Sequence, residues 1–271
     1  MNRIIVSIIT VLLCALLAIG IWGRLTISTT DGTPEDTVNE TVEPAEEPEE
    51  TAEPTEEPSE EPEETAAAVD ESAFTDTDSL LLVANKVHKL PEGYEPEDLV
   101  NVNDYGGHGT IAPYMRLEAA EALAEMTEAA MNEAGIYLSF SSAYRSESYQ
   151  ASLYNGYVAK YGVETADTIS SRPGYSDHQT GLACDFIEGG DADFTEDFEY
   201  TSSGEWLREN AHRFGFIMRY PKGKDDTTGY AYEPWHFRYV GVDTATAIYN
   251  VDEYESFEEY FNVAGGTVYE E

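Results

Sequence analysis

Two short segments of the chain carry residues that together could bind a metal ion. The first holds His178 and, seven positions later, Asp185; the second holds Glu233 and, three positions later, His236. Two imidazoles and one carboxylate can supply three ligands to a zinc ion, which leaves the fourth position free for water, as in catalytic sites. The remaining carboxylate, Glu233, could take a proton from that water. This spacing predicts a hydrolytic zinc site with His178, Asp185 and His236 as ligands.

Short strands are expected to position two of these ligands. The segment Gly181–Ile187 is typical of a strand, and the alternation of side chains along a strand places Asp185 on the face opposite to Cys184. We therefore expect Cys184 to be a core residue. A last strand at 235–240 would deliver the second histidine, whereas the first histidine lies in a polar turn.

The rest of the folded part shows helical and strand patterns in alternation. Apolar residues recur every three or four positions from Arg116 to Ala134 and predict a helix that ends at Gly135. Weaker patterns predict helices at 148–161, 203–214, 243–250 and 256–261, and strands at 80–84, 136–141, 216–220 and 235–240. The sequence has no βαβ phrase with a nucleotide-binding glycine fingerprint. We expect an α+β fold with a central antiparallel sheet flanked by helices.

The N-terminus has the composition of a membrane segment. The run Ile4–Gly23 is uncharged and is flanked by arginines on both sides. Twenty residues of helix span about 30 Å, which is enough to cross the hydrocarbon of a bilayer. We expect residues 1–25 to be a transmembrane anchor, with the rest of the chain on the outer side of the membrane. A cleaved signal peptide, or a lipoprotein signal at Cys14, is the alternative.

Residues 26–79 are rich in Glu, Pro and Thr and repeat the phrase Glu-Glu-Pro. Positions 31–71 hold 18 of the 54 acidic residues and no Lys or Arg, which predicts a disordered, extended linker. The chain carries a formal net charge of −40, and outside the anchor and this acidic tract it has 36 acidic and 12 basic residues. Such a surface repels phosphate backbones, so we expect no nucleic-acid partner. The folded domain is expected at 80–262, followed by a tail at 263–271.

The two metal-binding segments resemble those of the zinc D-alanyl-D-alanine carboxypeptidases of the VanY type, a family similar in fold to the lysostaphin and hedgehog groups. The pattern Ser-x-His-x-x-Gly-x-Ala-x-Asp at 176–185 matches the first signature of this family, and Glu-Pro-Trp-His-Phe at 233–237 matches its second. The segment 141–146, followed by Gln150, is similar to the part of the family that contacts substrate. The resemblance covers residues 80–261, and either histidine segment alone would be a weak sign of a metal site.

The resemblance implies that the three predicted ligands bind one zinc ion and that Glu233 is the general base. It implies that Arg145 stabilises the oxyanion of the substrate or binds its terminal carboxylate, and that Gln150 and Ser176 contact the substrate. Each of these last three residues also has a structural interpretation. Arg145 could form an ion pair, Gln150 could lie exposed on a helix, and Ser176 could cap the turn.

The expected function is therefore that of a membrane-anchored zinc metallocarboxypeptidase whose catalytic domain lies on the cell-wall side. It would remove the C-terminal D-alanine of peptidoglycan stem peptides as a D,D-carboxypeptidase. An L,D-carboxypeptidase acting on tetrapeptide stems and a cell-wall endopeptidase are alternatives. A wall-binding module without activity is less well supported, because a binding site has no use for a proton acceptor at Glu233.

Overall fold

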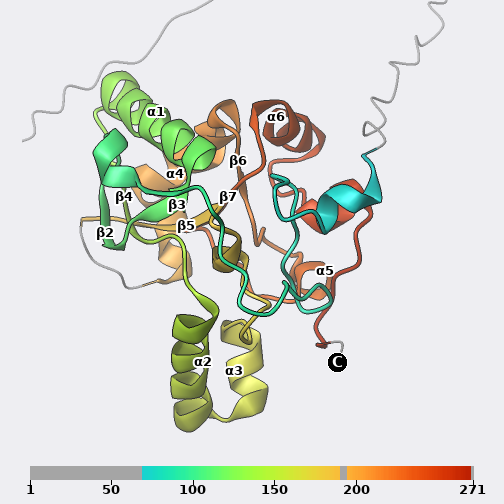
Figure 1. Cartoon of the computed structure of the whole chain (residues 1–271). Helices are drawn as coiled ribbons and strands as arrows, with labels where there is room; N and C mark the ends of the chain where they lie inside the picture. The colour runs from blue at the N-terminus through green and yellow to red at the C-terminus, as the bar shows by residue number, and fades with distance from the viewer. Residues whose placement is uncertain (1–68, 190–193, 270–271) are drawn as a thin grey trace, which may run out of the picture. The chain divides into compact units, whose positions relative to one another are not determined.

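A mixed β-sheet runs through the middle of the protein, and helices cover it (Figure 1). The computed structural model describes residues 69–189 and 194–269, and within them the largest sheet has five strands in the order β2–β4–β5–β7–β6. These strands are β2 Gly109–Ala112, β4 Ser139–Ser142, β5 Ala183–Ile187, β6 Phe216–Met218 and β7 His236–Tyr239. A smaller antiparallel pair joins β1 Leu99–Asn101 to β3 Tyr114–Arg116.

The expectation of a purely antiparallel sheet is wrong at one edge. Strand β2 pairs with β4 in parallel, whereas the pairs β4–β5, β5–β7 and β7–β6 are antiparallel. The connection from β2 to β4 passes through a helix, and such a crossover returns the chain in the same direction. Strand β2 was not predicted because its four residues include two small ones and come directly after a glycine-rich stretch.

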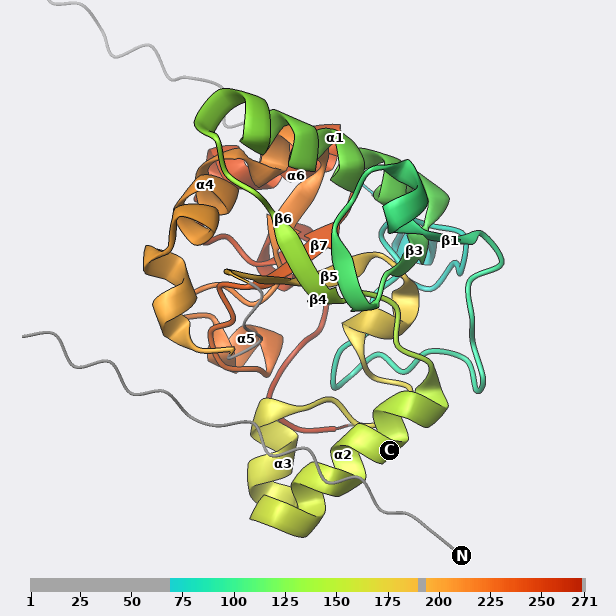
Figure 2. The same cartoon turned by 90° about the vertical axis from the view of Figure 1, so that its left-hand side faces the viewer.

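The helices are α1 Leu117–Ala134, α2 Glu147–Tyr161, α3 Val163–Ile169, α4 Ser202–Asn210, α5 Asp225–Thr228, α6 Val242–Val251 and α7 Phe257–Phe261. Helices α1, α4 and α6 lie on one side of the sheet, and the α2–α3 pair projects from the opposite side (Figures 1 and 2). The predicted α1 is confirmed: its residues at three- and four-residue spacing, from Ala119 to Ala130, are buried against the core. The predicted helix at 203–214 continues beyond α4 as a 3₁₀ turn.

The apolar run at 80–84 is buried from Leu82 to Ala84 but does not form the predicted strand. Leu82 is 2% exposed, yet the segment has irregular backbone. The guanidinium of Arg238 donates hydrogen bonds to the carbonyl oxygens of Leu80 and Leu82, at 2.9 and 2.7 Å. A side chain therefore satisfies carbonyls that a neighbouring strand would otherwise pair.

The folded part extends past both expected boundaries. Asp70 caps a 3₁₀ turn whose Phe74 is 7% exposed and contacts the rings of Phe257 and Phe261. At the other end, Tyr269 packs on the ring of Tyr175, with 4.9 Å between ring centroids. The predicted anchor and most of the predicted linker lie outside the described residues. Within 69–189 and 194–269 no helix combines the length and apolar character needed to cross a membrane.

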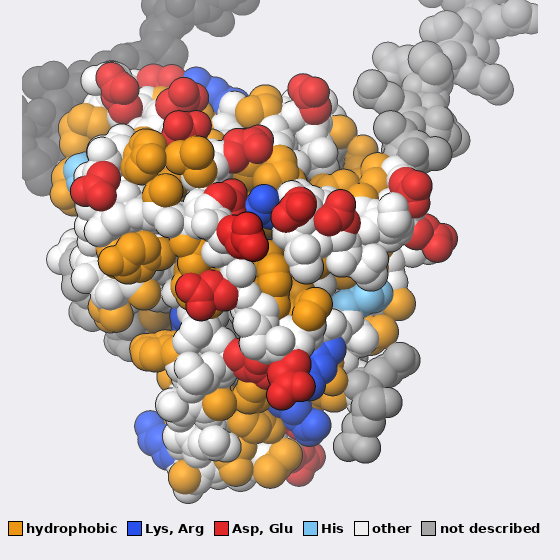
Figure 3. Space-filling view, in the orientation of Figure 1, with side chains coloured by type: hydrophobic (Ala, Val, Ile, Leu, Met, Phe, Trp, Pro, Cys, Tyr) orange, Lys and Arg blue, Asp and Glu red, His pale blue; other side chains and the backbone are white. Residues whose placement is uncertain are grey.

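Acidic side chains outnumber basic ones on the face shown in Figure 3. The view agrees with the excess of acidic over basic residues in the sequence. Several of the basic residues are not on the surface at all, because Arg219 and Arg238 are each 1% exposed. The acidic exterior thus surrounds an interior that holds buried positive charge.

Two glycines of the helical elements allow a matched test of backbone strain. Gly135 ends α1 with φ +70°, and a Cβ there would meet no atom of the described structure within 4 Å. Gly135→Ala should therefore lower the free energy of unfolding by about 1–2 kcal/mol through the backbone alone. Gly156, inside α2 and equally open, is the control: Gly156→Ala should raise stability by about 0.5–1 kcal/mol. Denaturant unfolding measures both, and effects of the same sign would contradict this explanation.

Candidate active site

The three predicted metal ligands meet at the centre of the sheet. Asp185 on β5 lies directly opposite His236 on β7 in the antiparallel register, and His178 lies in the 3₁₀ turn Asp177–Thr180 before β5. All three side chains are buried, and one ligand atom from each lies within 4.8 Å of the others. The Nε2 atom of His178 and the Nδ1 atom of His236 are each 3.1 Å from a carboxylate oxygen of Asp185. The prediction that these residues come together is confirmed.

Hydrogen bonds on the outer side of each imidazole leave one ring nitrogen free to bind metal. Nδ1 of His178 lies 2.7 Å from the carbonyl oxygen of Ala143, so it carries the proton and Nε2 faces the cluster. Nε2 of His236 lies 3.2 Å from a carboxylate oxygen of Asp177, so Nδ1 faces the cluster. This arrangement of outer partners is the one that orients histidines at metal sites.

Two buried polar atoms of the cluster fit a metal ion. Nε2 of His178 and Oδ1 of Asp185 make no hydrogen bond of good geometry within the described residues, although each lies 3.1 Å from another atom of the cluster. Unpaired buried acceptors are costly and therefore rare in folded proteins. Two nitrogen donors and one carboxylate form the ligand set expected of a catalytic zinc ion, which supplies the missing partner for both atoms.

The pKa values of the two histidines agree with a cation at this point. Burial and the nearby Arg145 lower the pKa of His178 to about 4, so its ring is neutral at pH 7, as a ligand must be. Burial also disfavours charge on His236, but hydrogen bonds to Asp177, Asp185 and Glu233 raise its pKa well above the usual value. These carboxylates favour positive charge beside His236, which a divalent cation provides.

Asp177 is a site residue that the sequence analysis missed. It is 1% exposed and pairs with the guanidinium of Arg238 in addition to His236, while Nε of Arg219 lies 3.8 Å away. Burial opposes its ionisation, but Arg238, His236 and Arg219 hold the pKa of Asp177 well below its usual value. The signal in the sequence was one arginine in the last strand and another directly after β6, because a buried arginine needs a carboxylate partner.

Glu233 lies at the open side of the cluster, as a general base must. Its Oε2 atom is 3.4 Å from Nδ1 of His236, and its side chain is 21% exposed. Burial raises the pKa of Glu233, which makes the carboxylate a better proton acceptor than one in water. The geometry therefore suits the predicted role.

Arg145 extends from the segment between β4 and α2 over the same cluster. Its backbone N–H donates to the carbonyl oxygen of His178 at 3.2 Å, and its Nη2 atom is 3.9 Å from Asp185. Its Nε atom is buried and has no hydrogen-bond partner within the described chain. The structural interpretation, an ion pair, accounts for only part of this guanidinium, and donors remain for a substrate.

A pocket of about 460 Å³ opens onto these side chains. Its wall includes residues that the sequence analysis did not select, among them Ile111, Tyr149, Tyr220, Tyr230 and Trp235. Gln150 and Ser176 also line it, so the pocket contains every predicted site residue.

Gln150 and Ser176 are buried in this wall. Gln150 is 1% exposed and donates to the carbonyl of Ser171 at 2.7 Å and to Ser170 at 3.2 Å, which excludes an exposed position. Within the described residues, Ser176 makes no capping hydrogen bond with its side chain. Contact of either residue with substrate stays a prediction.

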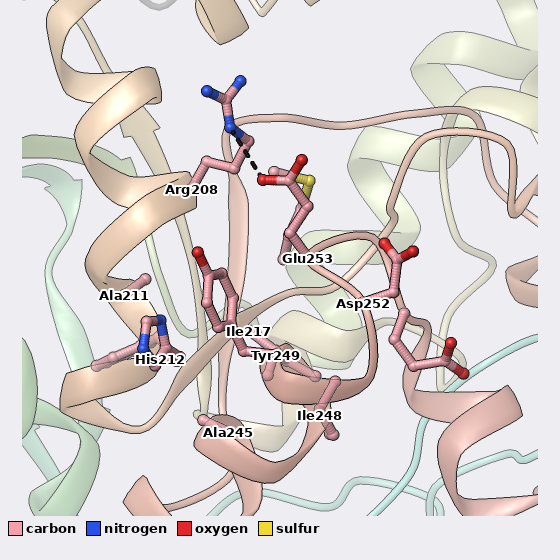
Figure 4. A pocket seen from close by; sticks show the side chains of 12 residues that line it. Arg208, Ala211, His212, Ile217, Ala245, Ile248, Tyr249, Asp252 and Glu253 are labelled. Carbon is pink, nitrogen blue, oxygen red and sulfur yellow. Dashed lines mark ion pairs between the residues drawn. The ribbon is translucent and has the colours of Figure 1, made fainter. Parts of the chain in front are cut away.

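A much smaller hollow of about 20 Å³ lies between α4 and α6 (Figure 4). The ring of His212 stacks there on Tyr249 at 3.8 Å, and Arg208 pairs with Glu253 at 3.5 Å. The space holds about one water molecule. It is too small for a substrate.

The geometry so far defines a zinc hydrolase, and comparison with known proteins identifies the family. Residues 112–242 match the family model for VanY, D-alanyl-D-alanine carboxypeptidase. YodJ of Bacillus subtilis (strain 168), provisionally named a carboxypeptidase, is 41% identical over 187 residues, which cover 68% of this chain and 67% of YodJ. The D-alanyl-D-alanine carboxypeptidase of Enterococcus faecalis (strain ATCC 700802 / V583) is 33% identical over 210 residues, 73% of this chain and 71% of that protein. The chain belongs to the VanY D-alanyl-D-alanine carboxypeptidase family.

Solved structures agree with this assignment. The LdcB LD-carboxypeptidase aligns with a TM-score of 0.63 and 39% identity over 69% of this chain and 88% of its own. VanYB in complex with D-alanine-D-alanine aligns with a TM-score of 0.56 and 33% identity over 67% of this chain and 96% of its own. A variant of the D,D-pentapeptidase VanY in complex with Zn(II) aligns with a TM-score of 0.56 and 32% identity over 67% of this chain and 98% of its own. The protein is a zinc-dependent peptidoglycan carboxypeptidase with a His-Asp-His site.

The buried charge of Asp177 should be needed both for the stability of the fold and for zinc affinity. Asp177→Asn leaves two buried arginines without full compensation and should lower the free energy of unfolding by about 3–5 kcal/mol. It also removes the charged partner of His236, so zinc affinity should fall by about 10- to 100-fold. Chelator competition and thermal unfolding measure the two effects. The control is Glu133→Gln, which breaks an exposed pair with Arg213 and should leave zinc affinity and stability unchanged. Normal zinc affinity in Asp177→Asn would refute the role given to Asp177.

Proposed function

We propose that this enzyme removes the C-terminal D-alanine of peptidoglycan stem peptides by cutting the D-alanyl-D-alanine bond. The observation that carries the proposal is the convergence of His178, Asp185 and His236 beside Glu233 in a pocket that also holds Arg145. The family description and the relative from Enterococcus faecalis support the D,D bond, as does the D-alanine-D-alanine bound to VanYB.

Each residue of the active site has its own role in hydrolysis. Zinc, when held by the three ligands, lowers the pKa of water to about 7 and polarises a carbonyl. Glu233 accepts the proton of the attacking water and returns it to the departing amine. Arg145 is always charged and forked, so it can bind the terminal carboxylate of the substrate or the developing oxyanion. The side-chain amide of Gln150 donates hydrogen bonds to Ser170 and to the carbonyl of Ser171, which stabilises the wall of the pocket.

An L,D-carboxypeptidase that acts on tetrapeptide stems is a second candidate. It is favoured by the identity to the LdcB LD-carboxypeptidase, 39% against 33% for VanYB, and by the higher TM-score of that alignment. Both reactions release D-alanine and need the same metal site. They differ in the residue that precedes the scissile bond and therefore in the shape of the pocket.

Release of D-alanine from synthetic stem peptides distinguishes the two reactions. The zinc-loaded enzyme should convert the pentapeptide to the tetrapeptide, with little further conversion to the tripeptide. Conversion of the tetrapeptide at the higher kcat/KM would establish the L,D reaction instead. Glu233→Ala should retain zinc but lose about 10²-fold or more in kcat, because the proton acceptor is gone. Unchanged turnover in that variant would contradict the role of Glu233, and no release from either peptide would contradict the proposed function.

We propose further that residues 1–25 anchor the protein in the cell membrane, with the catalytic domain on the wall side. The uncharged run Ile4–Gly23 and the arginines beside it support this placement. An extended acidic linker would let the domain reach on the order of 100 Å into the wall.

Protease treatment of intact protoplasts that express the full chain tests this placement. The full chain should sediment with membranes, and added protease should degrade the catalytic domain while a cytoplasmic marker survives. A domain that is protected until the protoplasts are lysed would show the opposite orientation. Recovery of the domain from the soluble fraction, cut after the apolar run, would indicate a cleaved signal peptide.

A further inference from the structure

Helix α2 carries a line of apolar and aromatic side chains that leads out of the active-site pocket. Tyr149, Leu153, Tyr157 and Tyr161 succeed one another at four-residue spacing, which places them along one face of the helix; we refer to them as the α2 stripe. The first three line the pocket that holds the zinc ligands, and Tyr161 lies beyond it. Tyr149 is 53% exposed and Tyr161 is 45% exposed, so the stripe is accessible at both ends.

The outer half of the α2 stripe holds a pair of neighbouring aromatic rings. The rings of Tyr157 and Tyr161 lie within 19° of parallel, with 6.3 Å between their centroids. The ammonium group of Lys160 lies 4.6 Å from the centre of the Tyr161 ring and adds a hydrogen-bond donor at this end. Exposed aromatic rings beside a positively charged hydrogen-bond donor suit an amphipathic ligand.

A glycine on the flank of the stripe is unexplained by packing. Gly156 lies inside α2, where glycine costs about 1 kcal/mol relative to alanine. A Cβ at this position would meet no atom of the described residues within 4 Å, so no neighbour requires its absence. Gly156 is three positions from Leu153 and four from Lys160, and therefore adjoins both on the helix surface. The missing side chain leaves the edge of the stripe open.

The α2 stripe is long enough to span a stem peptide that leaves the active site along the helix. If the C-terminal residue lies at the zinc ligands, the four residues before it extend over about 13–14 Å before they reach the sugar to which the stem is bonded. From Tyr149 to Tyr161 the helix rises about 18 Å. A stem peptide that leaves the zinc ligands along α2 would therefore end within the span of the α2 stripe, where its sugar would lie against the helix.

A sugar ring also fits the chemistry of this surface better than other occupants. One face of a pyranose presents C–H groups that pack on an aromatic ring, while its hydroxyl groups stay at the edge and remain hydrated. Anionic lipid and nucleic acid are disfavoured by the acidic domain. We propose that the α2 stripe binds the sugar of the glycan strand that carries the scissile stem peptide. This inference rests on the proposed function.

The experiment compares one stem peptide in two forms, free and attached to its disaccharide. The full-length, zinc-loaded protein should cleave the sugar-linked peptide with the lower KM. Tyr161→Ala should raise the KM for the sugar-linked peptide by about five- to tenfold and leave the free peptide unaffected. Tyr161→Phe keeps the ring and should behave as wild type.

Gly156→Gln provides a variant whose effect cannot be attributed to unfolding. It should raise the melting temperature, because glutamine favours the helix, while it raises the KM for the sugar-linked peptide alone. Tyr137→Ala is the matched control, since Tyr137 is a 58% exposed tyrosine outside the pocket and the stripe. This variant should leave the KM for both substrates unchanged.

The possible outcomes separate this inference from the proposed function. Cleavage of both peptides with equal KM, unchanged in Tyr161→Ala and Gly156→Gln, would overturn the sugar site and leave the carboxypeptidase intact. Cleavage of neither peptide would overturn the proposed function and the sugar site with it. If Tyr161→Ala instead alters the sedimentation of the protein and slows both substrates equally, the stripe is a contact between two copies of the chain and the sugar site is overturned.

Discussion

The buried ion pair between Asp177 and Arg238 joins the zinc site to the rest of the fold. Neither side chain is more than 1% exposed, and removing two such charges from water is expensive. The cost is offset because each charge has further partners: Asp177 also accepts from His236, and Arg238 also donates to the carbonyls of Leu80 and Leu82. One charged pair thus fixes a metal ligand and holds the N-terminal segment of the domain.

Arg219 extends this network to the C-terminal side of the domain. It makes two hydrogen bonds to Glu258 on α7, at 2.6 and 2.8 Å, and approaches Asp177 from the strand β6 side. The side chain of Glu258 also accepts from Asn85 at 2.9 Å. Two carboxylates and two guanidinium groups therefore balance in charge within the interior of the domain. These ion pairs lie inside the domain, where water screens them least.

The sequence predicted the parts of the site that depend on local pattern. Asp185 and His236 were placed on strands because each lies in a run of alternating or continuous apolar residues, and Cys184 is indeed in the core. The missed features depend on partners far along the chain. Strand β2 exists because β4 pairs with it, the segment at 80–84 is irregular because Arg238 reaches its carbonyls, and Asp177 acquires its role only when β6 and β7 bring two arginines beside it. Spacing within one segment does not contain this information.

Helix α2 shows why weak periodicity need not mean weak structure. Its buried side is polar: Gln150 holds the pocket wall, and the hydroxyl of Tyr154 donates to Asp167 at 2.6 Å. Asp167 binds the guanidinium of Arg172, whose ring partner is Tyr269 from the C-terminal end. Because polar contacts hold the buried side of the helix, Tyr149 and Tyr161 are not needed for packing and remain exposed. This inverted distribution weakened the helical signal in the sequence, and it leaves the apolar face of α2 available to a substrate that is longer than the pocket.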